Sequence, residues 1–382
     1  MNRQLSKNLL ALSIVLFWFA QYVYIPYQTP YLTGLGLSAG FVGIIVGTYG
    51  IAQMVLRLPV GLMADHVGRH KSFILLGGLF AGSASLFRIL IDGAAGFFIA
   101  NILSGMASAM WISFMVKYTS YYAEDDQQRG TAHVVVFNYG GMLMGFVAAS
   151  FLYRITSMRF LCLLSMIGGF ASALAALFME NEQTGTFHPS VRELLPVCLN
   201  KPLVFYSGLA LVQQGIHIAA AMSFTTQVVT DLGASSLVVG FCSITYMSMS
   251  VLFSYLSSFF VRKMSALYTL LLGFVCIIVY CLIVLATGSI PVIFLMQALL
   301  GFSSGLMFST LTSQAMKEVP KHQKSTAMGF FQAVYALGMT VMPMLMGALA
   351  ENISTQAAYL GIGSITAVTT VIFIFGAKVK KI

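Results

Sequence analysis

Charged residues are scarce in this chain. Only 8% of its 382 residues are Asp, Glu, Lys or Arg, whereas 58% are hydrophobic. A soluble domain carries about 25% charged residues, so this chain could not cover itself with an ordinary wetted surface. The scarcity also excludes a disordered protein, and a net charge of +9 on short loops does not indicate a nucleic-acid partner. The composition predicts an integral membrane protein.

Cysteine is scarce as well, with five residues. Only Cys198 lies in a polar stretch, and none has the spacing of a metal site, so we expect free thiols. The chain also lacks a P-loop and any nucleophile constellation. These absences exclude ATP drive and predict a protein that is no enzyme and has no cofactor and no metal site.

Long apolar runs fill most of the chain. A membrane helix needs about 20 apolar residues, and near-continuous runs favour helices over the alternating strands of a barrel. The second half contains as many runs as the first. We predict spans at residues 8–32, 39–64, 72–91, 96–120, 131–153, 159–179, 202–230, 237–261, 265–287, 290–314, 326–350 and 355–377.

The basic residues predict the orientation of these spans. If the chain starts inside, only Arg154 and Arg159 fall on the outer side, and Arg57 and Arg88 fall within spans. All other Lys and Arg residues then lie on the inner side, where they meet anionic lipid headgroups. We therefore expect both termini in the cytoplasm. The short loops favour a bacterial inner membrane.

The longest polar stretch in the chain, residues 180–201, divides the sequence into two halves. We predict a bundle at 1–179, a central cytoplasmic loop, and a second bundle at 202–382. The halves echo each other weakly. Segment 101–108 has its counterpart in 297–304, and both carry Gly at the fifth and Ser at the eighth position. Such matches indicate a parallel repeat.

One segment combines small, acidic and basic residues at a membrane edge. It lies between the second and third spans and reads GLMADHVGRHK. Gly61 permits close helix approach, and Asp65 must find a cation or a helix N-terminus. Gly68 permits a tight turn, while Arg69 and Lys71 anchor the cytoplasmic face.

This segment resembles the signature loop of the major facilitator superfamily, especially its bacterial drug and metabolite efflux branch. The resemblance implies an all-α membrane protein with twelve transmembrane helices in two six-helix bundles. It also implies that Asp65 and Arg69 latch the bundles together on the cytoplasmic side, with Gly61 packed against span eleven. The alternative is a charged anchor loop without a gating role. The expected latch comprises Gly61, Asp65, Gly68, Arg69 and Lys71.

Neutral polar residues concentrate on the spans that line the central cavity in that family. These are spans one, four, seven and ten, with contributions from five, eight and eleven. Each residue alone is as readily explained by a helix–helix hydrogen bond, but the set favours a cavity. The expected cavity residues are Gln21, Tyr24, Gln28, Arg57, Asn101, Asn138, Gln213, Gln214, His217, Gln297, Gln332 and Tyr335.

The ionisable residues within spans are few. No carboxylate falls at mid-membrane, which argues against proton antiport through a buried acid. His217 is the candidate proton carrier, although a structural histidine bonded across helices explains it at least as well. Arg57 is expected to pair with a substrate anion or to line the inner mouth. Arg88 is expected to snorkel and pair with Asp92 at i,i+4.

Three functions remain open. We expect a secondary transporter that exports lipophilic or amphiphilic small molecules by alternating access. Uptake or exchange of a small organic anion or nutrient through Arg57 is the alternative. A non-transporting scaffold or lipid-handling protein is a third possibility. The expected partners are a small-molecule substrate, membrane lipid and a coupling proton, and the chain is expected to act as a monomer without nucleic acid.

Overall fold

The computed structural model describes residues 3–67, 69–122, 127–180, 195–320 and 323–380. Its first half contains α1 (Arg3–Tyr22), α2 (Ile25–Gly34), α3 (Ala39–Val67), α4 (His70–Leu90), α5 (Ala94–Ala109), α6 (Trp111–Thr119), α7 (Gln127–Leu152) and α8 (Met158–Leu177). The second half contains η2 (Leu195–Leu199), α10 (Lys201–Ile216), the π-helix η3 (His217–Phe224), α11 (Thr225–Asp231), α12 (Ser236–Ala286), α13 (Ile290–Met316), α14 (Lys324–Asn352) and α15 (Thr355–Lys380).

Twelve membrane spans follow from these helices. Eleven helical segments in the described chain are long and apolar enough to cross a bilayer. One of them, α12, has 51 residues and turns at Ser265, whose φ of 69° lies outside the helical region. At about 1.5 Å per residue, α12 is long enough for two crossings of a core of about 30 Å. The break confirms the predicted boundary between spans eight and nine.

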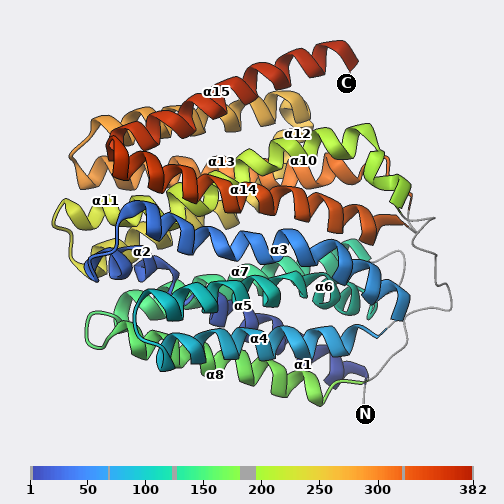
Figure 1. Cartoon of the computed structure of the whole chain (residues 1–382). Helices are drawn as coiled ribbons and strands as arrows, with labels where there is room; N and C mark the ends of the chain where they lie inside the picture. The colour runs from blue at the N-terminus through green and yellow to red at the C-terminus, as the bar shows by residue number, and fades with distance from the viewer. Residues whose placement is uncertain (1–2, 68, 123–126, 181–194, 321–322, 381–382) are drawn as a thin grey trace.

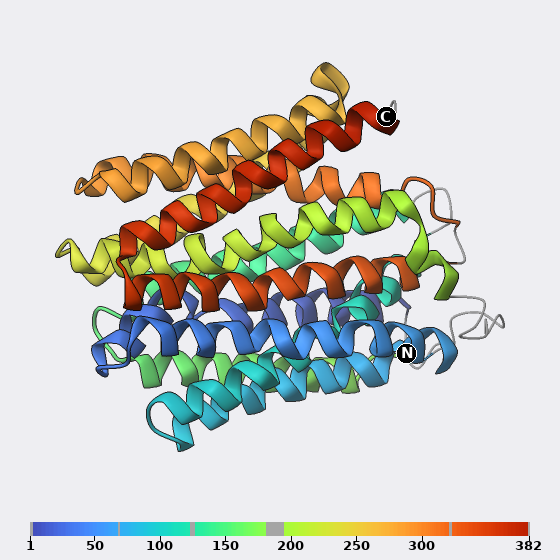
Figure 2. The ribbon, with the colours of Figure 1, turned by 45° about the horizontal axis from the view of Figure 1, so that its top comes forward.

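The helices form two bundles that lie side by side, with both chain ends at the same end of the molecule (Figure 1). We call this the terminal end and the opposite one the far end. Figure 2 shows the long helices of both bundles running between these two ends. Gly36 and Gly233 turn the chain at the far end with φ of 83° and 81°. Only glycine adopts this region readily, so the two halves repeat the same turn.

Three spans lose regular α-helical geometry part-way. The first is broken between α1 and α2, where Pro26 in the first turn of α2 lacks an N–H to continue the α1 ladder. The fourth is interrupted at Met110, between α5 and α6. The seventh contains the π-helix η3. Irregular backbone at membrane depth is tolerated where it is buried in protein or lines a cavity.

The two bundles meet most closely where α3 runs along α14. A Cβ added at Gly47 would lie 2.7 Å from the carbonyl oxygen of Thr340, and one at Gly43 would collide with the Pro343 carbonyl. From the other side, Gly347 faces the backbone of Ala39. Small residues let membrane helices approach to backbone contact, which is a main source of association without a hydrophobic driving force.

We predict that Gly47→Ala destabilises the protein by about 1–3 kcal/mol, because α3 and α14 must separate to admit the methyl group. Thermal unfolding in detergent measures this as a lower Tm. Gly140→Ala is the matched control, since a Cβ there meets nothing within 4 Å. Equal melting temperatures for the two variants would contradict the close contact.

Candidate functional site

A cavity lies between the two bundles near the middle of the structure. It has an empty volume of about 480 Å³. Its residues come from the first, second, fourth and seventh spans, which include all three irregular ones. The lining comprises Gln21, Tyr22, Tyr24, Ile25, Gln28, Thr29, Val46, Tyr49, Asn101, Ile218, Met222 and Ser223.

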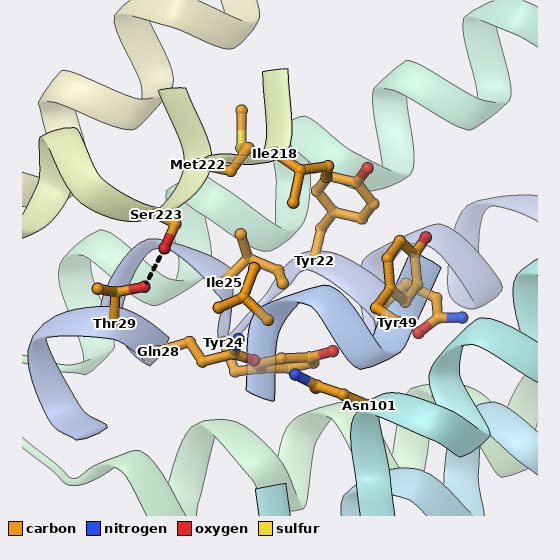
Figure 3. Close-up of a pocket in the computed structure, with 12 residues that line it drawn as sticks. Tyr22, Tyr24, Ile25, Gln28, Thr29, Tyr49, Asn101, Ile218, Met222 and Ser223 are labelled. Atoms are coloured by element: carbon orange, nitrogen blue, oxygen red, sulfur yellow. Dashed lines mark hydrogen bonds between the residues drawn. The ribbon is translucent and has the colours of Figure 1, made fainter. Parts of the chain in front are cut away.

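Lining residues of the two bundles face each other across the cavity (Figure 3). Tyr24, Gln28 and Asn101 lie on one side, from the first bundle. Ile218 and Met222 of η3 lie opposite, from the second bundle. Aromatic and apolar side chains with a few amides and hydroxyls suit an organic ligand that is largely apolar but carries some polar groups.

A hydrogen bond joins the two walls toward the far end. The hydroxyls of Thr29 and Ser223 are 2.6 Å apart and both side chains are buried (Figure 3). Thr29 also lines a second crevice of about 530 Å³, which includes Asp231 and Thr355 near the far end. The Thr29–Ser223 bond therefore lies between the central cavity and this outer crevice.

The first bundle holds a cluster of three polar side chains beside the cavity. Ser108 Oγ accepts a hydrogen bond of 3.1 Å from Gln21 Nε2 and lies 2.9 Å from the Tyr49 hydroxyl. Gly105, one turn earlier on α5, leaves room for the carbonyl of Tyr49. This glycine lets the two spans come close enough for the serine to reach the tyrosine.

The second bundle repeats this cluster with the same residue types. Ser304 Oγ accepts 2.9 Å hydrogen bonds from Gln213 Nε2 and from the Tyr246 hydroxyl. Gly301 leaves room for the carbonyl of Tyr246. The repeat predicted from segments 101–108 and 297–304 is therefore confirmed in three dimensions. His217 extends the second cluster, because its Nδ1 hydrogen-bonds the Tyr246 hydroxyl.

The expectation for Arg88 is wrong. Arg88 does not snorkel toward Asp92 but is 5% exposed inside the first bundle. Its guanidinium donates to the Tyr24 hydroxyl at 2.7 Å and to Asn101 Oδ1 at 2.9 Å. The oxygens of Ser104 and Ser85 accept at 3.1 and 2.9 Å. Four acceptors inside the bundle outweigh one exposed carboxylate in the turn just beyond the end of α4.

Arg57 connects the two bundles. It lies about two turns beyond Tyr49 on α3, toward the terminal end. Its guanidinium hydrogen-bonds Gln53 on its own helix and the Tyr335 hydroxyl on α14, and lies 5.0 Å from the centre of the Tyr335 ring. Arg57 and Tyr335, both expected in the cavity, thus meet each other outside the lining described above.

The remaining expected cavity residues also lie outside this lining. Gln297 donates to the Ala221 carbonyl at 3.3 Å, so it supports η3 from behind. Asn138 and Gln332 are buried, and Gln332 Oε1 has no hydrogen-bond partner in the described structure. Gln214 is half-buried on α10. Of the expected set, Gln21, Tyr24, Gln28 and Asn101 line the cavity itself.

The expected latch is only partly within the described structure. Gly61 is buried on α3, which runs along α14, and Arg69 is exposed at the start of α4. Lys71 donates to the Met179 carbonyl at 2.5 Å, within its own bundle. Gly68 and the side chain of Asp65 lie outside the described residues. The gating role of these residues stays a prediction.

Sequence reasoning missed the apolar part of the site. Tyr22, Ile25, Val46 and the η3 residues were indistinguishable from other apolar residues in spans. Thr29 carried the better signal, because it is a polar residue on a span expected to line the cavity, whereas Tyr49 lies on the second span, which was not expected to do so. Arg88 carried the strongest one, since a charge within a span is functional by default.

Comparison with known proteins identifies the family. Residues 10–339 match the Major Facilitator Superfamily, as do residues 209–381 in a second match. An uncharacterised MFS-type transporter of Methanocaldococcus jannaschii is 24% identical over 358 residues, or 87% of this chain and 88% of that protein. The staphylopine export protein of Staphylococcus aureus is 21% identical over 352 residues, or 87% and 86% of the two chains.

Solved structures agree in fold. A bacterial homologue of the human lysosomal transporter Spinster, in an inward-facing and unoccupied conformation, superposes with a TM-score of 0.75. The two share 13% sequence identity, and the match covers 98% of this chain and 95% of the other. The twelve spans and the two bundles are thus those of a known transporter fold, and the chain belongs to the Major Facilitator Superfamily.

Proposed function

We propose that this protein exports lipophilic or amphiphilic small molecules by alternating access. One observation carries the proposal: the walls of the central cavity come from different bundles, so a rocking motion changes the cavity and its access together. The apolar lining with scattered amides and hydroxyls fits amphiphilic molecules. The name of the staphylococcal relative supports the outward direction.

Hydrogen bonds join the two bundles toward the far end of the structure. Besides Thr29 and Ser223, the Tyr27 hydroxyl donates to the Ser236 carbonyl at 2.6 Å. The Gly40 amide donates to Glu351 at 2.8 Å. If both termini lie in the cytoplasm of a bacterium, as the basic loops predict, these contacts lie on the outer side of the cavity. They would have to part when substrate leaves.

At the terminal end, the proposed closing device is the pair Asp65 and Arg69. A carboxylate at a membrane edge needs a cation or a helix N-terminus to offset its desolvation. The α14 helix begins at Lys324, at the same end of the molecule as the α3–α4 turn (Figure 1). Closure there would complement opening at the far end.

We expect Asp65→Asn to insert and fold normally but to lose most transport, because the neutral amide cannot hold the terminal end shut against opening. Dye efflux from proteoliposomes measures the effect. Asp92→Asn, an exposed acid at the opposite end, is the control and should transport normally. Full transport by Asp65→Asn would contradict the latch.

The coupling ion proposed is the proton, with His217 as its carrier. His217 joins the Gln213, Ser304 and Tyr246 cluster and directly precedes the cavity residue Ile218. Imidazole is the side chain whose unperturbed pKa, about 6.5, lies nearest neutral pH. The proposed unit is a monomer in the lipid bilayer, with the small molecule as its partner.

A second candidate is uptake or exchange of a small organic anion through Arg57. The supporting observation is that Arg57 is 3% exposed and that, among the residues the structure describes, it hydrogen-bonds neutral groups only and its Nε has no partner. The anion site would lie between α3 and α14, on the terminal-end side of the central cavity.

Reconstituted vesicles distinguish these functions. We expect lipophilic dyes to move faster than in protein-free vesicles, and faster still under an imposed pH gradient. His217→Gln should remove the effect of the pH gradient. The control is His133→Gln, which should keep the effect, because His133 contacts Tyr122 at the terminal end.

Movement of organic acids but not of dyes, with that movement lost in Arg57→Gln, would favour the second candidate. Movement of neither class would indicate a non-transporting protein.

A further inference from the structure

Arg88 places a positive charge directly behind one wall of the central cavity. Two of its four hydrogen-bond acceptors, Tyr24 and Asn101, are lining residues. Its guanidinium carbon also lies 3.8 Å from the centre of the Tyr24 ring. Only the side chain of Tyr24 or Asn101 would separate this cation from a molecule in the cavity.

The charge of Arg88 is not neutralised by the described protein. The four hydrogen bonds that it makes to described residues all go to neutral oxygens, and its buried Nε has no partner among those residues. Among the carboxylates whose side chains the structure describes, none is buried. Burying a guanidinium costs several kcal/mol unless an opposite charge or a full set of hydrogen bonds offsets it. A negative charge in the cavity would reduce this cost.

The Tyr24 hydroxyl links Arg88 to the cavity through a hydrogen bond. Its oxygen accepts from Arg88 at 2.7 Å, so its own proton is directed elsewhere. The nearest described acceptor, Ser104 Oγ, is 3.5 Å away, which is the limit of a hydrogen bond. An anion in the cavity can accept this proton without displacing any bond that Arg88 already makes.

A second polar group on the same wall lacks a hydrogen-bond partner among the described residues. Gln28 is 4% exposed and lines the cavity one turn after Tyr24, and its Oε1 has no hydrogen-bond partner in the part of the chain that the structure describes (Figure 3). A carbonyl oxygen in such a place requires a donor. The wall therefore offers a donor backed by a cation at Tyr24 and an acceptor at Gln28, opposite the apolar wall of Ile218 and Met222.

We propose that Arg88, Tyr24 and Gln28 form a head-group site for amphiphilic carboxylic acids that carry an N–H beside the acid, as N-acylated or N-sulfonylated amino acids do. The carboxylate accepts the Tyr24 proton, the N–H donates to Gln28 Oε1, and the apolar part contacts η3. This inference rests on the proposed transport of amphiphilic molecules and names their class.

The probes are N-dansyl-phenylalanine and its methyl ester, which differ by one negative charge. Binding to the full chain in detergent is followed by dansyl fluorescence. We expect the wild type to bind the acid about tenfold more tightly than the ester, as one charge-assisted hydrogen bond can supply. Tyr24→Phe and Arg88→Gln should remove the preference, and Arg88→Lys should retain part of it. Arg154→Gln, an exposed arginine outside the bundles, is the matched control and should keep it.

The wild-type comparison keeps the proposal falsifiable even where Arg88→Gln does not fold. Equal binding of acid and ester, or an unchanged preference in Tyr24→Phe, would overturn the head-group site. Transport of the ester and of lipophilic dyes in vesicles would then still support amphiphile export. Binding of neither compound would overturn the proposed acid class, while the dye assay would judge export separately.

Discussion

A polar group inside a bilayer has no water with which to hydrogen-bond, and the arrangement of the whole molecule depends on this constraint. Each amide, hydroxyl and guanidinium within the spans must find its partner in the protein or in a ligand. The Ser108 and Ser304 clusters show the first solution, in which glycine brings two helices together so that short side chains can meet. Gln28 Oε1 illustrates the second solution, a partner supplied by a ligand, because at the cavity wall it has no hydrogen-bond partner among the described residues.

The same constraint explains how the bundles can move against each other. Within each bundle, polar side chains are tied across helices. Between bundles, the contact along α3 and α14 consists largely of backbone surfaces at glycines, with few polar bonds. The inter-bundle hydrogen bonds at Thr29, Tyr27, Gly40 and Arg57 are single and separate. Such an interface can exchange one closed arrangement for another without unfolding either bundle.

Sequence reasoning predicted the architecture well because hydrophobic length and glycine position are local properties. The twelve spans, the break near Ser265 and the repeated Gly-x-x-Ser segments all follow from short-range patterns. Partners across helices do not. Arg88 was assigned to Asp92, its neighbour in sequence, because nothing local reveals that Tyr24 and Asn101 converge on it. The apolar lining from η3 was hidden for the same reason, since Ile218 and Met222 look like any lipid-facing residues.

In the proposed cycle, substrate leaves through the far end when the bundles part between Thr29 and Ser223. The two hydroxyls are 2.6 Å apart, so cysteines at both positions should form a disulfide on oxidation. The most direct test is transport by Thr29→Cys/Ser223→Cys in a chain whose five native cysteines are replaced. We expect oxidation to abolish transport and reduction to restore it, whereas transport by either single-cysteine variant should not respond to oxidation. Undiminished transport by the fully cross-linked protein would contradict it.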